Sequence, residues 1–214
     1  LRSGPENDRS ASAVDMKGYY FITDAFLSRA GNESDVRAAV AAHAAAVQYR
    51  CKEGSTQALY AEAMRLRALC RTIPFLVNDR VDIALAVNAD GVHLGQDDMP
   101  FAVARRLLGA KKTIGLTVHT VAEAVAGVAA GADYLGVSPI FATATKKDAG
   151  SPAGLSLLSA IRKTVRLPLV AIGGITLAKA PDVVAAGADA VCAISAVVAA
   201  ENVGDEIAKI QRLF

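Results

Sequence analysis

The sequence predicts an α/β protein with the (β/α)8 architecture of a TIM barrel, and three observations carry this prediction. Eight short apolar segments alternate with longer stretches of helical character from Gly18 to the C-terminus. These segments are nearly continuous apolar runs, which is typical of parallel strands covered on both faces. A short motif ending in aspartate also recurs before three of them. An open, doubly wound sheet is the alternative, but it usually has fewer strands and needs a topological switch point.

The strand and helix candidates follow one another in strict order. The strands are Tyr19–Thr23, Ala46–Tyr49, Phe75–Val77, Gly91–Leu94, Ile114–Thr117, Tyr134–Val137, Leu169–Ala171 and Ala190–Ile194. The helices are Ser34–Ala45, Ser55–Thr72, Val81–Ala86, Pro100–Leu108, Thr120–Ala130, Leu155–Thr164, Leu177–Ala186 and Gly204–Leu213. In the second helix, Leu59, Ala63, Leu66 and Cys70 recur with the helical period.

The recurring motif predicts one helix-to-strand turn that is used three times. It reads Asn88-Ala-Asp90, Gly131-Ala-Asp133 and Gly187-Ala-Asp189. Its glycine or asparagine suits the left-handed residue at a helix end. The aspartates would lie at the N-terminal face of the barrel, opposite to the face that carries active sites, so we interpret them as structural.

Composition limits the classes of function. With 53% hydrophobic residues and a net charge of +2 in 214 residues, the chain is neither disordered nor suited to nucleic acid or an acidic membrane surface. No uncharged stretch approaches the roughly twenty residues of a membrane-spanning helix. We expect residues 1–15 to form a tail or an added segment, and residues 16–214 to form a single catalytic barrel. Three scattered cysteines favour a reducing compartment, the cytoplasm.

The active site of such a barrel forms at the C-terminal ends of its strands. The seventh and eighth strands end in Gly173-Gly174 and in Ile194-Ser195, each expected to lead into a helix. Backbone N–H groups at such positions bind phosphate. The alternative is that these glycines only make tight turns.

Other strand ends carry opposite charges. Gln48, Arg50, Lys52 and Lys146, with Thr143 and Thr145, would face Asn78, Asp79 and Asp98. Cations and carboxylates together indicate a polyphosphate bound with a divalent metal, for which Mg²⁺ prefers oxygen ligands. Asp79 and Asp98 could instead cap helices, and Arg50 and Lys52 could be solvated strand ends.

The histidines and Cys51 give weaker signals. His43 is expected in an alanine-rich helix as a packing or surface residue, and His93, inside a strand, could be a core residue whose hydrogen bonds are satisfied. His119 begins the helix after the fifth strand, nearer the rim. Cys51 lies among cations, which favour a thiolate, but it has no neighbouring histidine and we assign it no nucleophilic role.

A set of segments in this order resembles the thiamine phosphate synthase family. They are Tyr20–Asp24, Gln48–Lys52, Asn78-Asp79, Gly91–Asp98, Thr143–Lys146, Ile172–Thr176 and Ile194-Ser195. Together they extend from about Gly18 to the end of the chain. The glycine motif is shared widely among phosphate-binding barrels, whereas the complete set is specific.

The resemblance implies a transferase that joins hydroxymethylpyrimidine diphosphate to hydroxyethylthiazole phosphate and releases pyrophosphate. It implies Mg²⁺ on Asp79 and Asp98. It implies that Gln48, Arg50, Lys52, Asn78, Thr117 and Lys146 serve the diphosphate, with Arg50, Lys52, Thr117 and Lys146 the catalytic candidates. It implies that Thr143, Thr145, Gly174, Ile194 and Ser195 serve the thiazole phosphate.

Three positions depart from the family's usual residues. Tyr49, Thr117 and Ala142 stand where leucine, serine and proline are common. The threonine keeps the hydroxyl and adds a methyl group, and the alanine could loosen its loop. These differences concern affinity more than identity.

Two other functions compete with this prediction. A thiazole tautomerase would keep the phosphate-binding rim and use His119 as acid and base, without needing Asp79, Asp98 or the cationic second strand end. The second alternative is a non-catalytic phosphate-sensing barrel, and metal-dependent release of pyrophosphate from the paired substrates would separate all three functions. The expected partners are small molecules, not nucleic acid or membrane, and the sequence is compatible with a homo-oligomer.

Overall fold

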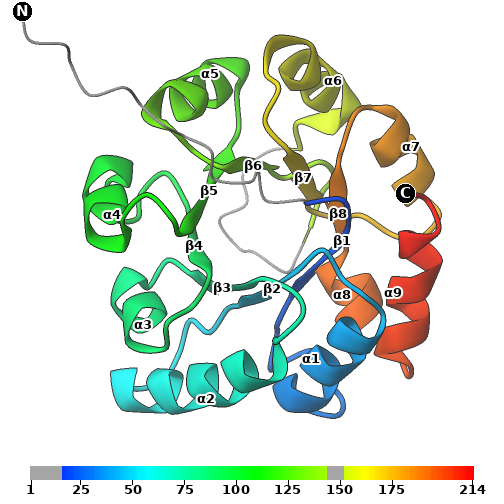
Figure 1. Cartoon of the computed structure of the whole chain (residues 1–214). Coiled ribbons are helices and arrows are strands. Elements are labelled where there is room, and N and C mark those ends of the chain that lie inside the picture. Colours follow the sequence, from blue (N-terminus) through cyan, green and yellow to red (C-terminus); the bar gives the residue numbers. More distant parts are fainter. Residues whose placement is uncertain (1–15, 144–151) are drawn as a thin grey trace, which may run out of the picture.

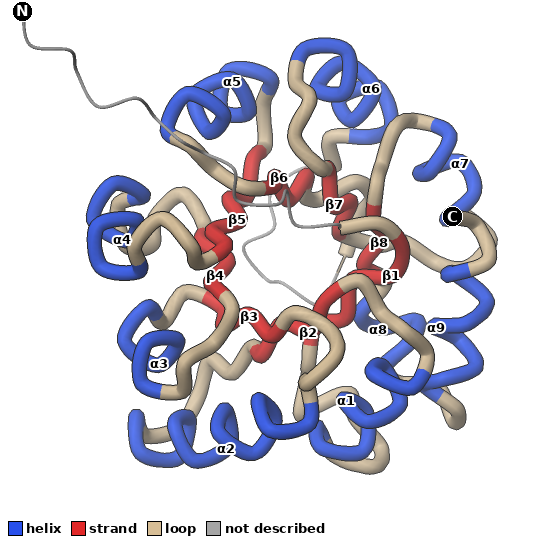
Figure 2. The backbone as a smooth tube through the Cα atoms, viewed as in Figure 1, coloured by secondary structure: helices blue, strands red, loops and turns tan. Residues whose placement is uncertain are grey.

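Eight parallel strands form a closed barrel surrounded by helices, as predicted (Figures 1 and 2). The computed structural model describes residues 16–143 and 152–214. The predicted tail of residues 1–15 therefore lies outside the described part of the chain. Within that part, no helix is long and apolar enough to cross a membrane.

Each strand pairs with its neighbours in sequence, and β1 closes the barrel on β8. The strands are β1 (Gly18–Ile22), β2 (Ala46–Tyr49), β3 (Phe75–Asn78), β4 (Gly91–Leu94), β5 (Thr113–Val118), β6 (Tyr134–Val137), β7 (Leu169–Ile172) and β8 (Ala190–Cys192). Our prediction for the last strand was too long. Ile194 begins a helix instead, because the chain turns outward directly after β8.

The helices lie outside the strands (Figure 1). They are α1 (Asn32–Ala41), α2 (Thr56–Leu69), α3 (Val81–Ala86), α4 (Phe101–Leu108), α5 (Val121–Ala130), α6 (Gly154–Thr164), α7 (Ala180–Ala185), α8 (Ile194–Val198) and α9 (Val203–Gln211). Two expectations were wrong. His43 lies beyond α1 with a φ of 54°, and α7 begins at Ala180 rather than Leu177.

Side chains from alternate strand positions build two cores. Tyr20 and Ile22 belong to the cluster inside the barrel, whereas Tyr19 and Phe21 pack in the layer between strands and helices. Because both faces are covered, all five residues of β1 are buried. The same alternation places Gln48 on the inner side of β2, since it pairs in register with Ile22.

The N-terminal face repeats one ion-pair arrangement. Asp133 accepts hydrogen bonds from Arg105 at 2.6 Å and from the backbone N–H of Ile114 at 2.7 Å. Asp90 and Asp189 make the equivalent pairs with Arg67 and Arg162. Each aspartate thus ties a preceding helix to the start of a strand, which supports the structural interpretation of the motif.

Candidate active site

A cavity of about 300 Å³ opens at the C-terminal ends of the strands. This is the end at which barrel enzymes place their active sites, and the volume suits a small molecule. The structure brings eleven of the predicted site residues together around it: Gln48, Arg50, Lys52, Asn78, Asp79, Asp98, Thr117, Thr143, Gly174, Ile194 and Ser195. The other two predicted residues, Thr145 and Lys146, lie outside the described residues.

The cationic side of the cavity is the loop that follows β2. The backbone N–H of Arg50 donates to the Thr23 hydroxyl at 2.9 Å, and this hydroxyl donates to the Arg50 carbonyl at 3.3 Å. These two bonds fix the loop to the end of β1. The next cation, Lys52, is half exposed and forms an ion pair with Asp79.

Asp79 is held at the end of β3 by its backbone. Its φ of 60° lies in the left-handed region, which aspartate adopts more readily than most residues other than glycine. Its N–H donates to the His93 carbonyl at 2.9 Å, and Asn78 Nδ2 donates to Oδ1 of Asp79 at 2.7 Å. The alternative role as a cap for α3 is wrong, because Arg80 occupies that position without a side-chain bond.

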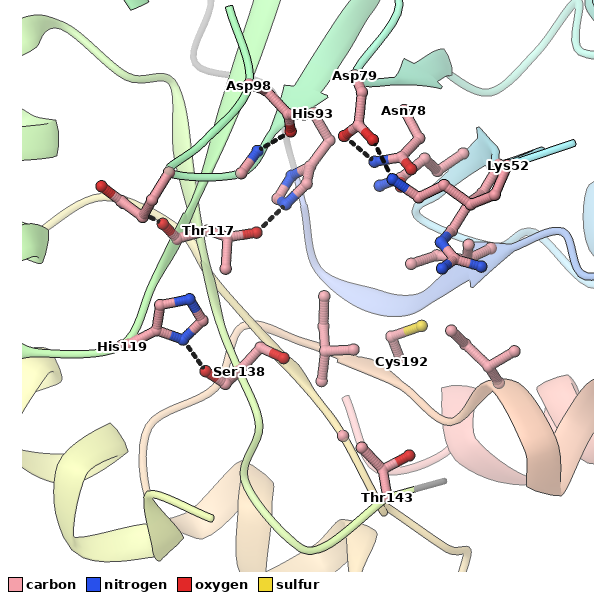
Figure 3. Close-up of a pocket in the computed structure, with 18 of the residues that line it drawn as sticks. Lys52, Asn78, Asp79, His93, Asp98, Thr117, His119, Ser138, Thr143 and Cys192 are labelled. Carbon is pink, nitrogen blue, oxygen red and sulfur yellow. Dashed lines mark hydrogen bonds and ion pairs between the residues drawn. The ribbon is translucent and has the colours of Figure 1, made fainter. Parts of the chain in front are cut away.

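Asp98 faces the same space from the loop after β4 (Figure 3). Its Oδ2 accepts a hydrogen bond from the Gly95 N–H at 2.6 Å, so it does not cap α4. Burial and the neighbouring Asp79 raise the pKa of Asp98 above the usual range. Arg80 does not neutralise this pair, because its guanidinium binds Asp82 at 2.6 Å. Lys52 is one cation beside two carboxylates.

This arrangement fits a divalent cation held jointly with a phosphate. Two carboxylates and the Asn78 amide offer oxygen donors, and Mg²⁺ is commonly bound by one or two carboxylates plus substrate phosphates and water. The described residues contain no cluster of three or more His, Cys, Asp or Glu that would hold a metal without such help. Burial and, after it, the neighbouring Asp79 raise the pKa of Asp98, and a bound cation would offset this cost of ionising the carboxyl group.

The glycine-rich side lies across the cavity. Gly174 has a φ of 60°, and a Cβ there would meet Phe141 Cβ at 2.9 Å. The loops after β6 and β7 are also joined by a hydrogen bond from Phe141 N to Gly173 O at 2.9 Å. Because α7 begins at Ala180, Gly174 offers loop N–H groups and not a helix N-terminus, which corrects the prediction.

Ile194 and Ser195 line the cavity and begin α8. The end of the eighth strand thus leads into a helix, as the phosphate-binding interpretation requires. Figure 3 shows Asp79, Asp98 and Lys52 on one side of the cavity and Thr143 on the other. The cavity therefore has an acidic and cationic side and a side lined by small and hydroxyl residues. This separation suits two phosphorylated ligands.

Several lining residues were not among the predicted site residues: Ile22, His93, Gly95, Gln96, Asp97, His119, Ser138, Ile172, Gly173, Ile175 and Cys192. Side chains alternate between the inner and outer faces of a strand, and this rule could have predicted that Ile172 and Cys192 face the cavity. The two residues pair in register at the inner side of β7 and β8. His119 Nδ1 lies 2.5 Å from the Ser138 carbonyl, which holds the ring against the wall. His93 is buried and hydrogen-bonded, as the core alternative expected, and its Nε2 lies 2.8 Å from Thr117 Oγ1.

Known proteins are similar to this chain in sequence and in fold. A family model described as thiamine monophosphate synthase matches residues 19–197. A thiamine-phosphate synthase of Chloroflexus aurantiacus is 55% identical over 90% of each chain, and that of Methanosarcina barkeri is 49% identical over 92% of this chain and 90% of its own. A thiamine phosphate pyrophosphorylase structure from Pyrococcus furiosus superposes with a TM-score of 0.85 at 39% identity, covering 93% and 96% of the two chains.

Proposed function

Because the chain belongs to the thiamine monophosphate synthase family and is a thiamine-phosphate synthase, a transferase, we propose how its residues divide between two substrates. One is hydroxymethylpyrimidine diphosphate, and the other is hydroxyethylthiazole phosphate. The proposal rests on one observation: two carboxylates, two cations and a glycine loop line the same cavity.

The diphosphate lies on the side of Arg50, Lys52 and Asn78 in this proposal. Arg50 and Lys52 come from the same loop, which the Thr23 hydroxyl fixes in place. Lys52 already forms an ion pair with Asp79 and can turn toward an incoming phosphate, since its side chain is half exposed. Lys146, predicted from sequence, adds a further cation, and Gln48 and Thr117 contact the same substrate from the cavity floor.

Asp79 and Asp98 would hold Mg²⁺ together with this diphosphate. When bound, the ion neutralises the charge of the phosphates. The protein's own contribution is to fix both carboxylates before the substrate arrives, through Asn78 on one and the Gly95 N–H on the other. Such preorganisation avoids reorientation during the reaction.

The thiazole phosphate lies on the opposite side. The N–H groups of the Gly174 loop and of the first turn of α8, near Ser195, are the proposed donors to its phosphate. Thr143, and Thr145 by sequence, would complete this subsite. The support is that Gly174, Ser195 and Thr143 all line the cavity.

The chemistry then requires positioning and charge stabilisation more than a protein nucleophile. The bond between the pyrimidine methylene carbon and the diphosphate oxygen breaks, and the pair of electrons leaves with pyrophosphate. The electron-rich pyrimidine carries the resulting positive charge until the thiazole nitrogen attacks the same carbon. Arg50, Lys52 and Lys146 stabilise the leaving group, and the cavity holds the two reactants in contact.

Release of pyrophosphate from the paired substrates is the decisive assay. The purified protein should release it only when both substrates and Mg²⁺ or Mn²⁺ are present, and EDTA should abolish the reaction. Full turnover in chelator would contradict the metal assignment. Isomerisation of a thiazole phosphate without the pyrimidine substrate would favour the tautomerase alternative, which would not need the charged residues around this cavity. The scattered cysteines support the proposal that the enzyme works in the cytoplasm.

A further inference from the structure

A chain of hydrogen bonds crosses the inside of the barrel beneath the cavity. Gln48 Nε2 donates to Tyr20 Oη at 2.8 Å, and Tyr20 Oη lies 2.7 Å from Tyr134 Oη. Tyr134 Oη lies 2.8 Å from His93 Nδ1, and His93 Nε2 lies 2.8 Å from Thr117 Oγ1. Both ends of this chain, Gln48 and Thr117, line the cavity.

The two tyrosines stay protonated within this chain. Tyr20 and Tyr134 have no exposed surface, and burial is the largest cause that raises the pKa of each phenol well above its ordinary value. Each hydroxyl therefore brings one proton to donate as well as lone pairs that accept. A buried O–H without an acceptor would be costly, so the direction of every bond in the chain matters.

The direction follows from the Gln48 end. The amide nitrogen only donates, so Tyr20 Oη accepts from it and directs its own proton to Tyr134 Oη. Tyr134 then donates to His93 Nδ1, which must be the unprotonated nitrogen of the ring. The neutral imidazole carries its proton on Nε2 and donates it to Thr117 Oγ1.

We propose that Tyr20, Tyr134 and His93 are positioning residues that make the Thr117 hydroxyl a donor toward the substrate in the cavity. Because Thr117 Oγ1 accepts from the ring, its own proton is directed to an acceptor atom of the pyrimidine diphosphate. The inference rests on the proposed function, since that places Thr117 against this substrate. None of the three positioning residues reacts.

The strands are built to accommodate this chain. Gly115 of β5 pairs in register with both His93 and Tyr134, and a Cβ there would overlap the Tyr134 ring. A Cβ on Gly136 of β6 would lie 2.8 Å from His93 Cε1. Glycine inside a strand weakens it, and close approach by another group is a recognised reason for its presence. The two rings therefore occupy space that neighbouring strands leave open.

The tautomer of His93 tests the direction without any substrate. Long-range ¹H–¹⁵N correlation spectra of the histidine-labelled free protein report which ring nitrogen is protonated, and a His93→Gln variant identifies the signal. We expect Nε2 to be protonated and Nδ1 to be unprotonated. Tyr134→Phe removes the donor to Nδ1 and should abolish this single tautomer. A protonated Nδ1 in the native protein, or an unchanged tautomer in Tyr134→Phe, would overturn the proposal.

Kinetics test whether the chain acts through Thr117. We expect Tyr134→Phe to lower kcat/KM for the diphosphate on the order of tenfold, as loss of one positioned hydrogen bond would. Tyr19→Phe is the matched control, because Tyr19 is equally buried in β1 but its hydroxyl bonds to the Ala193 carbonyl at 3.3 Å, outside the chain. Its kinetics and its His93 tautomer should stay native. Equal losses in the two phenylalanine variants would refute a specific role.

A double substitution separates positioning from general packing. In a Thr117→Val background the hydroxyl is absent, so Tyr134→Phe should cost less than about threefold, whereas a Thr117→Ser background should keep nearly the full loss. The same loss in both backgrounds would contradict the proposal. If the native protein shows the expected tautomer but forms no thiamine phosphate, the proposed function fails and the substrate role of the chain fails with it. If synthesis is normal but the tautomer is wrong, only the positioning proposal fails.

Discussion

Replacing Asp98 by asparagine removes one carboxylate of the proposed metal site and changes little else. The asparagine can still accept the hydrogen bond from the Gly95 N–H, which is 2.6 Å from Asp98 Oδ2. The folded state raises the pKa of Asp98, so ionising this group opposes folding. The stability that the protonated carboxyl group contributes is present below its unfolded pKa and is lost as pH rises through the raised pKa. At neutral pH a neutral residue removes this cost.

The expected magnitudes for Asp98→Asn differ sharply between stability and activity. The free energy of unfolding should change by less than about 1 kcal/mol, which is roughly 2–4 °C in Tm for a protein of this size. Activity at ordinary Mg²⁺ should fall by about 10²–10³, because charge stabilisation of the leaving group is lost. The Mg²⁺ concentration for half-maximal activity should rise at least about tenfold, and excess Mg²⁺ should recover part of the rate.

Asp133→Asn is the matched control at the opposite end of the barrel. It breaks the charged bond that Arg105 donates at 2.6 Å and weakens the bond from the Ile114 N–H. Both side chains of this pair are partly exposed, so solvent screening limits the loss to about 1–3 kcal/mol. Its Mg²⁺ dependence should remain native while its Tm falls.

Thermal unfolding without substrates and pyrophosphate release across a Mg²⁺ titration measure the two properties separately. The metal assignment predicts opposite outcomes for the two variants: Asp98→Asn loses activity and Asp133→Asn loses stability. If Asp98→Asn keeps the native Mg²⁺ dependence, or loses as much stability as Asp133→Asn, then Asp98 is structural and the reasoning is wrong.

Three further predictions follow from individual residues. Lys146→Ala should lower kcat on the order of 10²–10³ if this residue stabilises the departing pyrophosphate, whereas a change in KM alone would show that it only aids binding. Ser195→Pro should raise KM for the thiazole phosphate far more than KM for the diphosphate, because it removes a backbone N–H in the first turn of α8 that has no partner within the helix, and equal effects would contradict the subsite. Iodoacetamide should label Cys51 before Cys70 at pH 8, because Cys51 is partly exposed whereas Cys70 is buried and its thiol pKa is raised to about 12; mass spectrometry that finds faster labelling of Cys70 would refute the burial argument.

The sequence was sufficient to predict the barrel because its signals are local and repeated. Apolar strands such as Gly91–Leu94 and Tyr134–Val137 have the predicted boundaries, since aspartate precedes each of them and glycine or Ser-Pro follows. Errors fall where the chain turns without a strong local signal. Leu177 looks like the start of a helix, but the turn of α7 begins only at Ala180, and Ile194 looks like strand although α8 starts there.

The site was predictable where its residues follow strands directly and carry charge. Asp79 and Lys52 are examples, and their contact required only the rule that strand ends meet at one rim. Their hydrogen-bond partners were not predictable in the same way. The bond between His93 and Thr117 depends on which face of β4 and β5 each residue occupies, and hence on the register of the closed barrel.

The polar interior of the barrel explains why two strands contain glycine, a residue that weakens a strand. Gly115 and Gly136 lie inside strands, where each glycine costs about 0.5–1 kcal/mol relative to alanine. A barrel stabilised only by apolar packing would gain from filling these positions with branched side chains. Here the space is taken by the rings of Tyr134 and His93, whose polar atoms are bonded in a chain that ends at the cavity. A fully bonded buried network makes a rigid and specific interior, so the local cost at the two glycines is consistent with selection for a fixed cavity floor and not for strand stability.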